Sequence, residues 1–182
     1  MPDSPNDPPP KEPPSPAASA GAPGTPPLIL GEFQRVLDER YRVSIPVQLI
    51  DALALGEGDC VLAKERSGAL SLWNANAWQD KLDSGVQLVE SKIRAGRLDG
   101  RVEDVQRLGR LLSTRHRHVQ LAGRGRLLIP EGFRDFLGAP ESGELLIVGA
   151  AVCVEIWRPS AWIQYIEENM TEFRQLFDSL SG

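Results

Sequence analysis

The sequence predicts an α+β, β-rich fold in which two pseudo-symmetric repeats interleave their hairpins into one double-split β-barrel with peripheral helices. The first observation is a repeat: LDERYRVSIP at residues 37–46 recurs as LAGRGRLLIP at residues 121–130, 84 positions later. The same spacing links Leu62 to Leu146 and Trp73 to Trp157. A register kept without insertions indicates an internal duplication. One copy holds too few strands to close a sheet, so we expect the two copies to share a core.

Composition limits the classes of protein to which the chain can belong. Hydrophobic residues make up 41% of it, which is enough to bury a core, and the net charge of −5 restricts nucleic-acid binding to a local basic cluster. No apolar run approaches the roughly 20 residues that span a membrane. The N-terminal residues lack signal-peptide features, so we expect a cytoplasmic protein with no membrane partner. Cys60 and Cys153 lie in apolar strands and are predicted to be buried thiols in a reducing compartment.

Changes in composition divide the chain into five segments. Residues 1–30 are rich in Pro and predict a disordered tail, which is either a plain linker or, around residues 13–16, a ligand for a Pro-binding module. The remaining segments are repeat 1 (31–82), a helical connector (83–114), repeat 2 (115–166) and a C-terminal helix extension (167–182).

Within the first repeat, apolar residues of one parity over 33–45 predict two half-buried strands around a polar turn at 38–41. Pro46 ends the second strand, and a short helix is expected over 47–55, closed by Gly56 and Gly58. Strands at 60–63 and 70–73 then form a hairpin around Ser67 and Gly68. Asn76 stands where the N-cap of the next helix is expected.

The connector and the second repeat complete the pattern. Apolar spacing over 86–93 and 102–112, interrupted by Gly96 and Gly100, predicts two amphipathic helices whose basic residues form either a solvated face or a phosphate track. The second repeat predicts strands at 119–121 and 127–129, a short helix, a hairpin over 145–157 and a last helix capped by Ser160. Apolar residues recur every three or four positions from Trp162 to Leu180, so this helix should pack against the core or another subunit.

Paired arginines occupy the polar turn of both repeats, Arg40 and Arg42 in the first, Arg124 and Arg126 in the second. We expect these two turns to lie together on one face of the shared core. Guanidinium groups bind phosphate oxygens or the guanine edge in the major groove, which favours nucleic-acid binding. Alternatively the arginines pair with nearby carboxylates such as Asp38, although the second turn lacks an acidic counterpart.

These residues resemble the MraZ family of bacterial transcriptional regulators. The resemblance rests on Gly31-Glu32-Phe33, on the Ile-Pro ends of both repeated motifs, and on the closing Glu-Ile-Trp-x-x-x-x-Trp at 155–162, and it covers 31–82 and 115–166. It implies two swapped-hairpin units of the SpoVT-AbrB/MazE type. It further implies a ring-forming homo-oligomer, associated with the nucleoid, that binds tandem repeats in double-stranded DNA upstream of division and cell-wall genes.

The family motif Asp-x-x-x-Arg maps onto Asp38 and Arg42, and its second Arg maps onto Arg126. Ala122 stands where the second Asp is expected, and Tyr41 stands where a Gly precedes the first Arg. Asp38 can accept hydrogen bonds from the turn backbone and pair with Arg42 four residues on, so we predict that it orients this guanidinium before DNA binds.

Enzyme motifs are absent from the sequence. His116 and His118 lack the companions of a metal site, and no nucleophile elbow or phosphate-binding Gly loop occurs, so we expect no catalysis, cofactor, metal or small-molecule substrate. The four Trp residues follow the duplication, which fits core anchors better than base stacking. Two function classes stay open: a DNA-binding regulator acting through the Arg turns, and an oligomeric interaction scaffold that kept the barrel and lost DNA binding.

Overall fold

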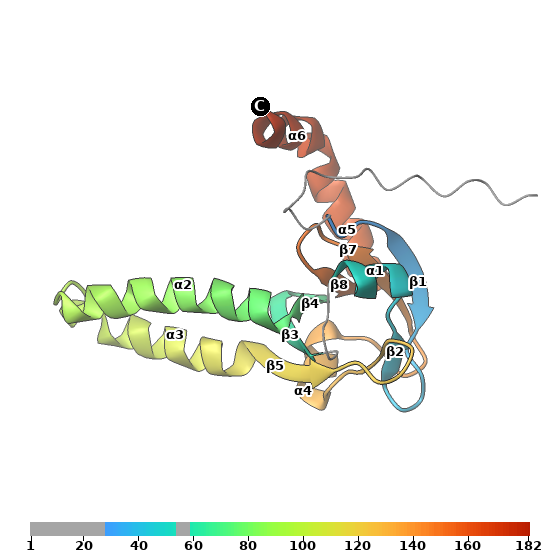
Figure 1. Ribbon diagram of the computed structural model, residues 1–182, viewed down its shortest axis with the longest axis horizontal. Coiled ribbons are helices and arrows are strands. Elements are labelled where there is room, and N and C mark those ends of the chain that lie inside the picture. Colours follow the sequence, from blue (N-terminus) through green and yellow to red (C-terminus); the bar gives the residue numbers. More distant parts are fainter. Residues whose placement is uncertain (1–27, 54–58) are drawn as a thin grey trace, which may run out of the picture.

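The structure is a computed structural model that describes residues 28–53 and 59–182 (Figure 1). Six strands form an antiparallel sheet in the order β1-β7-β8-β4-β3-β5, and β2 pairs with β6 in a separate two-stranded sheet. The strands are β1 (Glu32–Val36), β2 (Arg42–Ser44), β3 (Asp59–Arg66), β4 (Ala69–Asn74), β5 (His116–Gln120), β6 (Arg126–Leu128), β7 (Glu144–Gly149) and β8 (Val154–Trp157). The α-helices are α1 (Val47–Ala52), α2 (Ala75–Arg94), α3 (Val102–Arg115), α4 (Glu131–Leu137), α5 (Pro159–Asn169) and α6 (Phe173–Ser181), with 3-10 turns η1 (Asp99–Arg101) and η2 (Met170–Glu172).

Each repeat contributes its first strand to the hairpin of the other repeat. β1 pairs with β7 of the β7–β8 hairpin, and β5 pairs with β3 of the β3–β4 hairpin. The two hairpins then join edge to edge through β4 and β8. The repeats therefore share one sheet, as expected for units that are too small to bury a core alone.

Equivalent residues of the two repeats face each other across a pseudo-two-fold axis. Val43 pairs with Leu127 in the small sheet, and Ser71 pairs with Glu155 in the large one, each pair being 84 residues apart. Hydrogen bonds at both ends of the small sheet obey the same relation. Ile45 donates its N–H to the Gly125 carbonyl at 2.9 Å, and Ile129 donates to the Tyr41 carbonyl at 2.9 Å.

The predicted equivalence of Leu62 and Leu146 is wrong by one residue. Val61 pairs with Trp73 whereas Leu146 pairs with Trp157, so Leu62 corresponds to Ile147. Leu62 and Ile147 are both fully buried in the main core, while Leu146 packs on the other face of the sheet. Because successive strand residues point to opposite faces, the 84-residue spacing would place one of the two leucines on the wrong face. Trp73 and Trp157 do occupy equivalent places.

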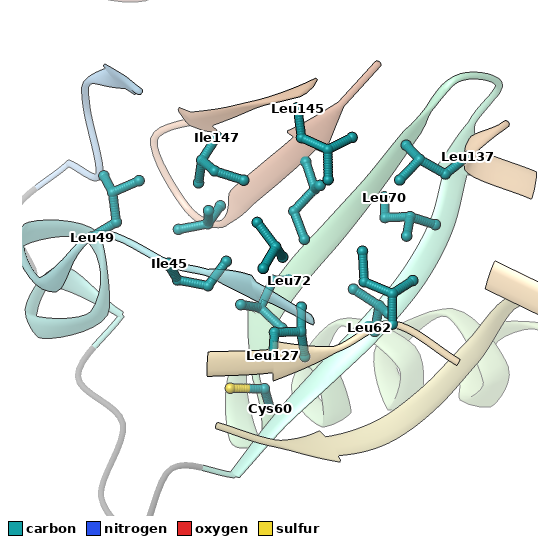
Figure 2. Packing of buried hydrophobic residues seen from close by; sticks show 14 of the residues in the cluster. Ile45, Leu49, Cys60, Leu62, Leu70, Leu72, Leu127, Leu137, Leu145 and Ile147 are labelled. Atoms are coloured by element: carbon teal, nitrogen blue, oxygen red, sulfur yellow. The ribbon is translucent and has the colours of Figure 1, made fainter. Parts of the chain in front are cut away.

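The described strands do not form one closed barrel. β1 and β5 are the edges of the large sheet, and the β2–β6 sheet is separate, although β1 contacts β2 and β5 contacts β6. The main core contains side chains from both sheets together with Leu49 of α1 and Leu137 of α4, as Figure 2 shows. What the structure shows is thus an α+β fold with a large antiparallel sheet, and its described residues do not show the double-split barrel that the sequence predicts.

The other face of the large sheet is covered by the beginnings of α2 and α5. Trp73 and Trp78 lie with ring centroids 5.8 Å apart, and Trp157 and Trp162 lie 5.3 Å apart, so the tryptophans act as core anchors. Cys153 is buried beside the first Trp pair and Cys60 in the main core. The burial of both cysteines confirms the prediction of buried thiols, and it raises the pKa of the Cys60 thiol to about 11 and that of Cys153 to about 12.

Both predicted N-caps are wrong. Asn74 caps α2, since its side chain accepts hydrogen bonds from the N–H groups of Asn76 at 2.9 Å and Ala77 at 3.2 Å. The helix α5 begins at Pro159 without a side-chain cap, so Ser160 lies inside its first turn. Pro159 supplies the helical φ and has no N–H to be satisfied, so this helix has less need of a side-chain cap.

Three boundaries also differ from the sequence prediction. The single helix expected over 162–180 is two helices, because η2 separates α5 from α6. The helix α2 runs unbroken across residue 83, where the connector was expected to begin. Ile29, assigned to the tail, is buried in the main core and forms a β-bridge with Ala151. The tail up to residue 27, and Gly56 and Gly58 after α1, lie outside the described residues.

Candidate nucleic-acid interface

The β2–β6 sheet is a two-stranded ribbon with one face in the core and one face in solvent. Val43 and Leu127, which are paired, are 1% and 0% exposed and point into the core. Alternation along a strand then places the flanking side chains on the outer face. The outward set is Arg42, Ser44, Arg126 and Leu128, all of which are exposed except the half-buried Arg42.

This geometry brings Arg42 and Arg126 close together. Arg42 pairs with Leu128, and Ser44 pairs with Arg126, so the two arginines are diagonal neighbours on the outer face. Side chains in that relation have Cα atoms about 7–8 Å apart. The turns themselves lie at opposite ends of the ribbon, because the strands are antiparallel. Arg40 and Arg124 therefore lie in turns at the two ends of the ribbon rather than in two adjacent turns.

In the first turn, the carboxylate of Asp38 organises both the backbone and the following arginine. Its Oδ1 accepts hydrogen bonds from the N–H groups of Arg40 and Arg42, each at 2.9 Å. Its Oδ2 accepts from the Arg42 Nε at 3.0 Å, forming an ion pair. The backbone hydrogen bond from Arg42 is the largest cause that lowers the pKa of Asp38. The predicted contact between Asp38 and Arg42 is thus present without DNA.

The second turn provides a hydrogen-bond acceptor for the backbone N–H of its arginine without a carboxylate. Ala122 has no polar side chain, and the N–H of Arg126 instead donates to the Ala122 carbonyl at 3.1 Å. Arg124 and Gly125 both adopt left-handed conformations, with φ of 62° and 74°. Within the described part of the chain, Arg124, Arg126 and Arg40 form no ion pair. Only Arg42 follows the alternative in which the arginines pair with nearby carboxylates.

Tyr41 keeps the backbone conformation that a glycine would adopt. Its φ is 56°, close to that of its repeat equivalent Gly125. The Arg134 guanidinium lies over the Tyr41 ring, 3.6 Å from the centroid, and the phenol donates a hydrogen bond to Glu141. This hydrogen bond raises the pKa of Tyr41. Side-chain contacts therefore hold a left-handed tyrosine, which costs about 1–2 kcal/mol relative to glycine.

Ser44 is a further candidate residue of this interface, which the sequence analysis did not select. It lies on the outer face opposite Arg126 and lines a shallow hollow together with Gly123, Arg124 and Arg126. Serine hydroxyls contact phosphate oxygens in many DNA complexes. The sequence could have indicated it by parity: Ser44 is two residues from Arg42 in the same strand, so both side chains lie on the same face. Elsewhere in the described residues, no three His, Cys, Asp or Glu side chains gather where a metal could bind, and no helix is long and apolar enough to cross a membrane.

Comparison with known proteins finds similarity to proteins named MraZ. The family model described as MraZ protein matches residues 114–180. A transcriptional regulator MraZ from Methylobacillus flagellatus is 31% identical over 148 residues, covering 80% of this chain and 92% of that protein. The protein of that name from Thermus thermophilus is 30% identical, covering 76% and 87%, and that from Syntrophomonas wolfei is 26% identical, covering 84% and 96%.

The chain belongs to the MraZ family. These curated relatives carry the name of transcriptional regulators. Among solved structures, the solution structure of PHS018 from Pyrococcus horikoshii covers 72% of this chain and 96% of its own, with 11% identity. Its TM-score of 0.30 is too low for it to inform the fold of this chain.

Proposed function

We propose that this chain is a transcription regulator that binds double-stranded DNA through the outer face of the β2–β6 ribbon. The observation that carries the proposal is the pair Arg42 and Arg126 on the outer face of a ribbon whose opposite face is buried, with Arg40 and Arg124 in the turns at its two ends. A two-stranded ribbon fits the major groove, where arginine can bind guanine edges while its neighbours bind phosphates. The chain is otherwise acidic, with a net charge of −5, so attraction to DNA depends on this local cluster.

The two central arginines have different roles in this proposal. Asp38 holds the Arg42 guanidinium in one orientation before DNA arrives, so Arg42 loses little side-chain entropy and reads a base. Arg126 has no such partner among the described residues, and it and Arg124 bind phosphate oxygens. Ser44, which pairs with Arg126 on the ribbon, adds a hydroxyl to the same phosphate contact.

The family implies the targets and the assembly that complete the proposal. The regulator acts in the cytoplasm, at the nucleoid, on tandem DNA repeats upstream of division and cell-wall genes. Copies of the chain assemble into a homo-oligomeric ring of swapped-hairpin units. Several ribbons then engage successive repeats, and linkage of weak sites raises the overall affinity by effective concentration.

The test compares Arg42→Ala and Arg126→Ala by fluorescence anisotropy on a duplex selected from a random pool by the unaltered protein, and on a scrambled duplex. Arg42→Ala should cost about 1–3 kcal/mol on the selected duplex and reduce sequence preference. Arg126→Ala should weaken both duplexes alike and reduce the salt slope, because one phosphate contact fewer releases fewer counterions. Arg110→Ala, on the exposed side of α3, is the matched control and should change neither.

Two results would contradict parts of the proposal. A larger loss of preference from Arg126→Ala would reverse the assigned roles. If the unaltered protein did not bind DNA at low salt, the other function class would stand: an oligomeric scaffold that has lost DNA binding.

A further inference from the structure

The C-terminal helix α6 exposes a continuous apolar stripe. No residue of α6 is buried, and the rings of Phe173 and Phe177 lie side by side with centroids 6.2 Å apart. The exposed members of the stripe are Phe173 (61%), Leu176 (58%), Phe177 (61%) and Leu180 (79%) of α6, preceded by Met170 (57%) of η2. Contiguous apolar surface of this kind marks an interaction site rather than an ordinary solvent face.

A second apolar surface lies between α2 and α3. A groove of about 390 Å³ separates the two helices, and the rings of Trp78 and His116 close its inner end at a centroid distance of 5.5 Å. Its walls are Leu82, Val86 and Val89 of α2 and Val105, Leu108 and Leu112 of α3. None of these six is fully buried, so within the described chain the facing sides of the helical hairpin are incompletely packed.

The two surfaces complement each other in shape, and the segments that carry them have opposite net charges. One is a convex helical stripe, and the other is a concave apolar groove. The hairpin from residue 75 to 115 carries eight basic and six acidic residues, a net charge of +2. Residues 159–182 carry one basic and four acidic residues, a net charge of −3. The opposite net charges of the two segments favour their encounter.

One chain does not bring its own two surfaces together. In Figure 1 the α2–α3 hairpin extends away from the sheet in one direction, and α5 and α6 extend in another. Within one chain α6 is therefore directed away from the groove, and a second copy of the chain can supply it.

We propose that α6 of one subunit docks in the α2–α3 groove of a neighbouring subunit. This inference rests on the self-association proposed above and assigns the two surfaces that produce it. The contact is heterologous, since a different patch is used on each partner. Such contacts repeat from subunit to subunit until a ring closes or a filament grows.

The test measures the mass of the full chain by sedimentation and light scattering over a concentration series. Phe177→Asp alters the stripe, and Leu108→Asp alters the groove. Each should raise the dissociation constant for self-association by roughly 30-fold or more, as for loss of a central anchor residue. The matched controls are Gln175→Asp on the opposite side of α6 and Gln106→Asp on α3, both exposed, and neither should change the mass.

Mixing the two altered proteins gives the decisive measurement. Phe177→Asp retains an intact groove, and Leu108→Asp retains an intact helix, so the mixture should form a one-to-one complex that stops at a dimer. This rescue also shows that both variants are folded. A monomeric unaltered protein at micromolar concentration would overturn the inference, as would a Leu108→Asp variant that keeps its full mass. Anisotropy with a duplex that holds one site measures DNA binding separately. If the protein failed to bind that duplex, the proposed function would be contradicted while the result on subunit docking would still hold.

Discussion

Substitution of Gly125 by alanine should destabilise the protein through one identifiable turn. Gly125 has a φ of +74°, and a Cβ there would lie 2.9 Å from the Ile45 carbonyl oxygen and overlap the end of the Ile50 side chain. The carbonyl cannot easily move, because the N–H of the same residue, Ile45, donates a hydrogen bond to the Gly125 carbonyl at 2.9 Å. The substitution thus combines an unfavourable backbone conformation with a steric clash.

The expected magnitude follows from these two terms. A left-handed conformation costs a residue with a Cβ about 1–2 kcal/mol. Overpacking in a well-filled site typically adds about 1–3 kcal/mol. Gly125→Ala should therefore lower the free energy of unfolding by about 2–5 kcal/mol, measured by urea denaturation at one fixed protein concentration, since self-association would shift the midpoint.

Gly123→Ala is the matched control in the same turn. An added Cβ at Gly123 meets nothing within 4 Å, and the residue is not left-handed. That substitution should change the free energy of unfolding by no more than about 1 kcal/mol, with stabilisation expected from the smaller entropy of the unfolded chain. Equal stability of Gly125→Ala and Gly123→Ala would refute the role assigned to the turn.

Two further predictions concern the core. Leu127→Ala should lower the free energy of unfolding by about 2–5 kcal/mol because Leu127 is fully buried, while Leu128→Ala, 57% exposed, should stay within about 0.5 kcal/mol in the same denaturation assay. Stability should also fall as pH rises from about 9 towards 11, because the pKa of Cys60 is raised from 9.0 to about 11 in the folded chain and the unfolded state loses its thiol proton first. A Cys60→Ala variant should show a weaker decline over this interval in unfolding measurements at about pH 8 and about pH 10.5, and an unchanged decline would contradict the assignment.

Local patterns in the sequence determined the elements and the inward faces of several of them. Parity placed Val43 in the core, and the repeated prolines marked where β2 and β6 end. The contact between Asp38 and Arg42 was also predictable, because it joins residues four apart through one turn. Such features depend on neighbours in the chain, whose distances are limited by covalent geometry.

Tertiary structure decided which residues of distant segments meet. The 84-residue spacing could not reveal that Leu62 corresponds to Ile147, since a shift of one residue becomes visible only when strands pair and one face must be buried. The diagonal approach of Arg42 and Arg126 likewise exists only after β2 and β6 pair antiparallel. The sequence by itself thus determined the repeats and the chemistry of their turns. Burial of two incomplete units in one core decided how those turns are arranged in space.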